Sequence, residues 1–152
     1  MSVIDQILKN ADWVRENFGP QSGLSDFGYN VESVAYIDGY IERNLRGATD
    51  RQTLAKFISL LGSFIGEALR SKHGGQWIVA DNSPILKIQR GEMMHMVQPF
   101  GKVEKRIANG EVDSLVFFFN EFVPAILEGR APPEWKIAEL QPRSRRSWWK
   151  IW

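Results

Sequence analysis

Residues 54–80 read LAKFISLLGSFIGEALRSKHGGQWIVA, and along this stretch the hydrophobic period changes from that of a helix to that of a strand. From Leu54 to Leu69 apolar residues recur on nearly every side, which is typical of a helix buried at the centre of a domain. Gly74-Gly75 is a stop signal for that helix. The alternation from Gln76 to Ala80 then indicates a short strand. The stretch predicts a central helix that leads directly into a sheet.

Two amphipathic helices are predicted before the central one. Apolar residues at helical spacing run from Ile4 to Phe18, where Gly19-Pro20 is expected to end the helix. A second run extends from Val31 to Leu45, with Asn30 as its N-cap residue. Thr49-Asp50-Arg51-Gln52 has the spacing of a capping box, so we expect the central helix to begin there.

Strands and two more helices are predicted after the central stretch. Segments of period two at Ile85 to Gln89 and Met93 to Gln98 complete a three-stranded antiparallel meander. Helical spacing returns at Lys102 to Ala108 and at Val112 to Leu127, where Pro124 is expected to kink the helix or shift its boundary. This order predicts an α+β fold with three N-terminal helices, the meander, two further helices and an irregular, basic, Trp-rich tail.

The charge distribution separates a body from a tail. Residues 1–129 hold 13 Lys and Arg against 16 Asp and Glu, whereas residues 130–152 hold 6 against 2. We therefore expect a single domain over 1–129 and a C-terminal tail over 130–152. The opposite net charges of the two parts favour docking of the tail on the domain.

Composition excludes several classes of site. The chain has no cysteine, so it has no thiol nucleophile, no thiolate metal site and no disulfide framework. Phosphate-binding, zinc-protease and nucleophile-elbow motifs are also absent. With two histidines in the chain, we predict no metal site and no cofactor. The start lacks the features of a secretory signal, and no run approaches the ~20 apolar residues that span a bilayer, so we expect a cytoplasmic protein.

Glu67 provides the one candidate pocket. It is the only charged residue in the most apolar part of the central helix, so its carboxylate must pair with a cation, reach solvent or lie in a specialised site. We expect a structural ion pair. In the alternative, Trp77, Tyr40 and His95 converge on Glu67 under the sheet. That pocket would make the protein a small-molecule binder or a hydrolase-like enzyme.

The two histidines have separate interpretations. His73 is expected to be a cation at the C-terminal end of the central helix. His95 alternates with Met93 and Val97 on one face of its strand. It is interpreted either as a half-buried, hydrogen-bonded side chain or as an acid-base or pH-sensitive residue.

Gly62 and Gly66 lie four residues apart, on a row of small residues with Ala55 and Ser59. Glycine weakens a helix, so we expect these positions to let another backbone approach closely.

Two segments are candidates for binding a partner. Tyr36 and Tyr40 lie one turn apart on a separate helix face, which is either a second packing surface or an exposed aromatic patch. The tail carries the other candidates, which are Arg143, Arg145, Arg146, Trp148, Trp149 and Trp152. A segment that combines basic and aromatic residues can dock on its own domain, bind another protein, or bind a membrane surface or single-stranded nucleic acid. We expect docking or a protein partner first and nucleic acid last, because the basic segment is short.

Three segments carry a resemblance to a known family: Leu61 to Glu67, Gly74 to Trp77, and Pro99 to Gly110. They resemble a small bacterial domain family of unknown function, in which a helix ending in Gly-x-x-x-Gly-Glu leads to Gly-Gly-x-Trp and a short sheet. The resemblance covers roughly residues 54 to 122 and implies no catalytic residues. Similar small α+β domains occur among bacterial immunity and accessory proteins, which favours a binding role by analogy.

These observations lead to three ranked hypotheses. The first is a non-enzymatic bacterial protein-interaction domain, with an immunity or adaptor protein as its most concrete form. The second is the ligand pocket around Glu67 and His95. The third is a peripheral membrane or nucleic-acid binding protein that acts through the tail.

Overall fold

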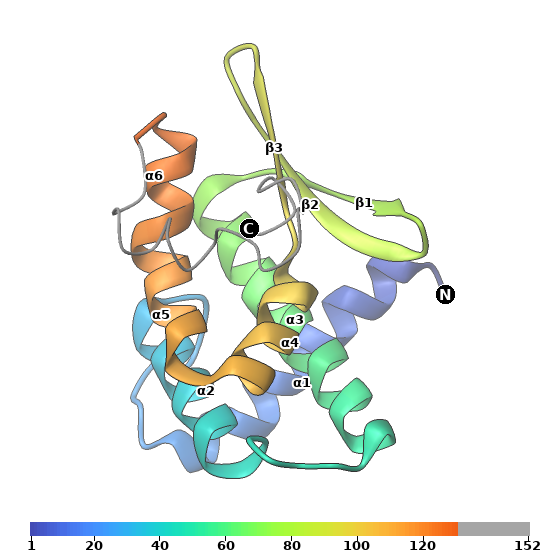
Figure 1. The fold of residues 1–152 in the computed structure, drawn as a ribbon, viewed down its shortest axis with the longest axis vertical. Helices are drawn as coiled ribbons and strands as arrows, with labels where there is room; N and C mark the ends of the chain where they lie inside the picture. Colours follow the sequence, from blue (N-terminus) through green and yellow to red (C-terminus); the bar gives the residue numbers. More distant parts are fainter. Residues whose placement is uncertain (131–152) are drawn as a thin grey trace.

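A computed structural model describes residues 1–130 of the chain (Figure 1). Its elements, in chain order, are α1 (Val3–Ser22), α2 (Val31–Asn44), α3 (Arg51–His73), β1 (Gln76–Ala80), β2 (Ser83–Arg90), β3 (Met93–Val97), α4 (Pro99–Asn109), the 3-10 turn η1 (Gly110–Asp113), α5 (Leu115–Phe117), the π turn η2 (Phe118–Phe122) and α6 (Val123–Leu127). The fold is α+β, as the sequence predicted. The predictions made for the end of the tail lie outside the described residues.

Helix α3 forms the centre of the domain, where it contacts α1, α4 and β2 (Figure 1). Every residue from Leu60 to Leu69 is buried, which confirms the central helix predicted from its apolar residues. The N-terminal part of α3 lies nearer the surface, with Lys56 exposed and Phe57 half-buried. The two halves of α3 therefore have different surroundings.

The predicted end of the first helix is wrong, and the third helix starts where predicted but with a different cap residue. Helix α1 continues through Pro20 to Ser22 and ends at Gly23, which has a φ of 75°. Pro20 lacks the amide that would bond the Glu16 carbonyl, so the last turn of α1 has one hydrogen bond fewer without ending there. Helix α3 is capped by Asp50, whose carboxylate accepts a hydrogen bond from the Gln52 amide at 3.2 Å, so the cap is not Thr49.

The start of α2 is confirmed and that of α4 is corrected. Asn30 caps α2 by accepting a hydrogen bond from the Ser33 amide at 2.9 Å. Helix α4 begins at Pro99, earlier than the predicted Lys102. Proline fits the first position of a helix because the amide it lacks would have no helical partner there.

The sheet has the order β1-β2-β3 and is antiparallel, as predicted. Its buried face carries Trp77, Leu86, Ile88 and Val97. The first turn was predicted to span four residues but consists of Asp81-Asn82 alone, both with positive φ. These are the residue types and dihedral angles of a two-residue hairpin turn that matches the strand twist. The β2–β3 hairpin projects beyond the helices (Figure 1).

The last predicted helix is interrupted. The Val123 amide donates to the Phe118 carbonyl, five residues back, so the chain makes one wider turn before α6. Pro124 follows at once, and in a regular helix its ring would crowd the carbonyl four residues earlier. The shift expected at Pro124 therefore takes the form of a π turn. Among the described residues, no helix is long and apolar enough to cross a membrane.

Candidate functional site

Glu67 lies at the centre of the candidate site, and its carboxylate is fully engaged. Its side chain is 4% exposed, whereas that of Arg70 is 43% exposed. Arg70 donates from Nε to Oε2 at 2.8 Å and from Nη2 to Oε1 at 2.9 Å. The Trp77 indole donates from Nε1 to Oε2 at 2.8 Å. The ion pair expected from the sequence is confirmed, with Arg70, one turn further along the same helix, as the cation.

The hydrogen bonds to Glu67 keep it ionised. Burial alone would raise the pKa of this carboxyl group, but the hydrogen bonds from Arg70 and Trp77 outweigh burial and lower it. Glu67 in turn raises the pKa of Arg70. A carboxylate with a lowered pKa and both oxygens occupied is an acceptor at neutral pH and has no proton to donate. We refer to Glu67, Arg70 and Trp77 below as the carboxylate cluster.

Two glycines make room for the aromatic side chains beside this cluster. A Cβ atom at Gly66 would fall closer than 3.0 Å to the Trp77 ring, and one at Gly62 would meet Phe100 Cε1 at 2.9 Å. The expected close approach is therefore real, but it is made by aromatic rings and not by a backbone. The absence of a side chain at Gly66 lets the indole lie against α3 and reach Glu67.

Tyr29 is the tyrosine nearest this site, and sequence reasoning missed it. Its ring centroid is 5.4 Å from that of Phe64 and 5.0 Å from the Arg15 guanidinium. Burial raises the pKa of Tyr29, Arg15 opposes that change, and the charge of Glu67 adds to it. Its contacts come from α3 and α1, which are distant in sequence, so the residues next to Tyr29 give no signal of this position.

Tyr40 does not join the carboxylate cluster, so that part of the predicted pocket is wrong. Its ring centroid lies 4.7 Å from that of Phe18 and 5.8 Å from that of Phe57. Phe57 precedes Glu67 by ten residues, or about 15 Å along a helix. Burial, with a smaller contribution from Tyr36, raises the pKa of Tyr40.

Tyr36 and Tyr40 form a packing surface. The Tyr36 ring centroid lies 5.9 Å from that of Phe27 and 6.2 Å from that of Phe18, which Tyr40 also contacts. Both tyrosines are half-buried. The structure thus supports the packing interpretation over an exposed aromatic patch.

His95 also lies apart from Glu67. His95 pairs with Ile88, whereas Leu86 pairs with Trp77 on one side and with Val97 on the other. The pair that contains His95 is therefore two residues closer to the hairpin turn than the row that contains Trp77. Within the described residues no hydrogen bond or ion pair joins His95 to Glu67. Burial, helped by Arg90, lowers the pKa of His95. The pocket proposed from the sequence is therefore not assembled, and Trp77 is the only predicted partner that contacts Glu67.

His73 is not the cation expected at the end of α3. Burial, with further contributions from Lys72 and Arg90, lowers its pKa to about 4, so the ring is neutral at pH 7. Its Nε2 atom is buried and makes no hydrogen bond to the described residues. The His73 carbonyl instead accepts a hydrogen bond from Arg90 Nη2 at 2.7 Å. The positive charge near this helix end comes from neighbouring side chains.

A second ionic cluster, on α4, was not predicted at all. Arg106, 1% exposed, bonds Asp38 at 2.8 Å and Glu42 at 3.0 Å, both on α2. Asp38 also accepts a hydrogen bond from the Leu115 amide at 2.9 Å. On the same helix, Lys102 bonds Asp113 at 2.7 Å. Arg106 follows Val103 by three residues and so shares the buried face of α4, but its residue type argues against burial, because long cationic side chains usually reach solvent.

These features define an α+β domain built on a central helix, with a buried, fully satisfied carboxylate under a small sheet. Within residues 1–130 no group of three or more His, Asp or Glu side chains is arranged to hold a metal ion. Comparison with protein-family models, with curated proteins and with solved structures finds no match to this chain. The resemblance to a small bacterial domain family stays a prediction.

Proposed function

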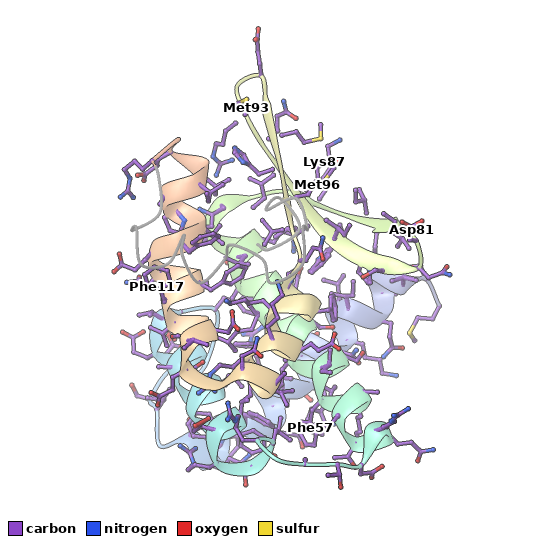
Figure 2. All side chains as sticks on the ribbon, in the orientation of Figure 1. Phe57, Asp81, Lys87, Met93, Met96 and Phe117 are labelled. Carbon is purple, nitrogen blue, oxygen red and sulfur yellow. The ribbon has the colours of Figure 1, made fainter. Side chains whose placement is uncertain are left out.

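We propose that the protein acts by binding another protein through the projecting β2–β3 hairpin, with an immunity or adaptor role as its most concrete form. The observation that carries this proposal is the exposure of Met93, at 64%, and Met94, at 45%, on a hairpin that extends away from the helical body. Figure 2 shows Met93 near the end of that hairpin. Large apolar side chains exposed on a projecting element are typical of a binding surface.

The character of these side chains supports a protein partner. Methionine is flexible and polarisable, so it fits the irregular surface of another protein well. β3 is also an edge strand of the three-stranded sheet. An edge strand presents backbone amide and carbonyl groups that an extended segment of a partner can pair with. The hairpin thus offers both apolar contacts and directional hydrogen bonds.

By register Met94 lies on the outer face of the sheet and Met93 on the inner face, so the outer face extends the surface from Met94. By register, Lys87 and Met96 are a cross-strand pair on the face opposite the buried one. Figure 2 shows both on the side of the sheet away from the helices. Ile78 and Ile85, also paired on this face, are half-buried. An apolar strip thus runs from the middle of the sheet toward the hairpin end.

The carboxylate cluster supports an enzyme less well. Both oxygens of Glu67 already accept hydrogen bonds from Arg70 and Trp77. A reacting group would have to displace one of these donors and leave it unsatisfied, which is costly in a buried site. We therefore assign Glu67 a structural role.

Site-directed photocrosslinking tests the proposal. A photoreactive phenylalanine analogue is placed at Met93 and, as a control, at Val112 on η1, which is 51% exposed. In cells that produce the protein, the Met93 probe should give one discrete adduct and the Val112 probe should not. The partner identified by mass spectrometry is then purified and its affinity measured for the wild type and for the Met93→Ser, Met94→Ser double variant.

The double variant should lose the complex and keep the wild-type unfolding midpoint, because both side chains are exposed. Equal crosslinking from Met93 and Val112, no adduct from Met93, or unchanged affinity of the double variant would contradict a hairpin-mediated interaction.

A further inference from the structure

A group of basic side chains gathers between the end of α3 and the projecting hairpin. Lys72 and His73 come from the last turn of α3, and Arg90 and His95 come from the hairpin face that packs toward it. Figure 1 shows the hairpin and α6 rising on either side of this helix end. Glu128, which follows α6, is the acidic group that acts on His73. We refer to Lys72, His73, Arg90 and His95 as the basic cluster.

Arg90 is held in place by neutral groups. Its Nη2 donates to the His73 carbonyl at 2.7 Å and its Nη1 donates to the Gln89 carbonyl at 2.9 Å. Among the described residues it makes no ion pair with a carboxylate. Its guanidinium is thus positioned while its charge stays uncompensated. The remaining N–H groups of the fork suit a carboxylate.

Lys72 adds a second charge, which makes no ion pair with a carboxylate of residues 1–130. Its ammonium lies 5.0 Å from the centroid of the Phe119 ring on η2, an interaction that orients the cation without neutralising it. Glu128 is itself paired, since Arg130 Nε lies 2.7 Å from its carboxylate. Two cations therefore face the same region with little negative charge between them.

Besides burial, nearby cations help to lower the pKa values of the His73 and His95 imidazoles. Burial is the main reason why both pKa values are lowered, and Arg90 contributes to each, with Lys72 also acting on His73. His73 carries in addition a buried Nε2 atom that makes no hydrogen bond to the described residues. A buried polar nitrogen without a partner is uncommon and calls for an explanation.

We propose that the basic cluster binds the carboxylates of an acidic segment of the protein partner, with Arg90 and Lys72 as the primary contacts. This inference rests on the proposed function for the class of partner, and it adds the chemistry of the segment recognised. Met93 is the cross-strand partner of Arg90 on the same hairpin face, so one segment can place an apolar residue against Met93 and an acidic residue against the adjacent Arg90. Opposite charges at the edge of such a contact fix its register and speed association.

The surroundings favour an acidic protein segment over a nucleic acid. Residues 1–130 carry 14 Lys and Arg against 16 Asp and Glu. The cluster has two cations, Lys72 and Arg90, and so offers only a short stretch of positive charge. A phosphodiester backbone would need a longer row of cations than the two that this cluster provides.

Binding of a carboxylate should also change the state of His73. A negative charge beside the ring favours its protonated form and raises its pKa, and the protonated ring can donate from Nε2. The complex then takes up a proton, so affinity should rise as pH falls from about 7 to about 5. The charged groups that act on His73 are Lys72 and Arg90, which lower its pKa, and Glu128, which raises it.

Nuclear magnetic resonance of the two imidazoles tests the proposal on the whole chain. A hexaglutamate peptide is titrated into the labelled protein, with a hexaglutamine peptide, inorganic phosphate and a single-stranded oligothymidylate as parallel probes. The hexaglutamate peptide should shift the His73 and His95 signals, raise the pKa of His73 and bind more weakly as salt increases. Lys72→Gln and Arg90→Gln should each weaken binding by about threefold or more.

The control is Arg51→Gln, which removes an exposed cation at the opposite end of α3 and should leave the affinity unchanged. Three outcomes would overturn the proposal: no shift at His73 and His95, equal losses for Arg51→Gln and Arg90→Gln, or tighter binding of phosphate or oligothymidylate than of the peptide. Peptide binding without a Met93 crosslink would retain the basic cluster and reject the hairpin interaction. The reverse result would retain the hairpin and reject the cluster.

Discussion

Gly66→Ala is the substitution whose effect the structure specifies most closely. The new methyl group would overlap the terminal ring atoms of Trp77, and Pro99 Cγ at 3.2 Å limits movement on the other side. Trp77 is 7% exposed and is anchored to Glu67 by its indole N–H. The ring must therefore move, and moving it breaks or strains that hydrogen bond.

The expected loss of stability is the balance of three contributions. Overpacking costs about 1–3 kcal/mol. Loss of the hydrogen bond to the buried carboxylate costs about 1.5–3 kcal/mol. Alanine is better than glycine in a helix by ~1 kcal/mol, which offsets part of the cost. The free energy of unfolding should fall by about 1.5–5 kcal/mol, or roughly 5–15 °C in melting temperature.

Urea unfolding of five proteins measures this balance: the wild type, Gly66→Ala, Gly101→Ala, Trp77→Phe and the double variant Trp77→Phe, Gly66→Ala. Gly101→Ala, in α4, is the matched control because its Cβ would meet nothing closer than 3.6 Å, and it should be neutral or stabilising by up to ~1 kcal/mol. In a Trp77→Phe background, Gly66→Ala should lose most of its cost, because phenylalanine lacks the atoms that overlap the methyl group. If Gly66→Ala is as stable as the wild type, or if its cost is the same in both backgrounds, the packing of Trp77 against α3 is described wrongly.

Three further predictions concern ionic groups. Glu67→Gln should lower the free energy of unfolding in urea by about 1–3 kcal/mol, because Arg70 and Trp77 lose a charged acceptor. Since the pKa of Glu67 is lowered in the fold, wild-type stability should also decline as pH falls below 4.5. A Gln variant with the same acid sensitivity as the wild type would contradict this role. His73 has a pKa of about 4 in the fold against 6.5 in the unfolded chain, so the unfolded chain binds the proton first and stability should drop as pH falls through that interval. His73→Gln should flatten this part of the pH profile, and an unchanged profile would show that the ring is not buried in its neutral form. Arg106→Met should lower the free energy of unfolding by about 3–5 kcal/mol, because Asp38 is left without its cation. Arg51→Met, at an exposed position, should change the urea midpoint little. Equal effects of the two substitutions would place Arg106 at the surface.

The class of fold was predictable because its signals are local. The apolar run of α3, the change of period at Gly75 and the Asn30 cap each depend on neighbouring residues alone. Errors arose where a strong local signal was overridden. Pro20 lies inside α1 because the last turn continues with one hydrogen bond fewer, and Asp50 replaces Thr49 as the cap because the carboxylate accepts from the amide two residues on.

The candidate site was predictable only in part. That Glu67 needs a cation follows from its apolar surroundings, and Arg70 lies within reach on the same helix. That Tyr40 and His95 lie elsewhere depends on helix rotation and strand register, which composition does not reveal. The burial of Arg106 depends on how α2 and α4 approach, a long-range feature that its residue type does not indicate.

The central position of α3 has a consequence for how the chain can be divided. The helix contacts α1, from the N-terminal part of the chain, and also α4 and β2, from the part that follows it. A cut on either side of α3 would leave one fragment with an uncovered apolar helix and the other without the surface on which it packs. The helical first half and the sheet-containing second half are therefore not modules that could be exchanged or inherited separately. They gain or lose their order together, and α3 is the element that couples them.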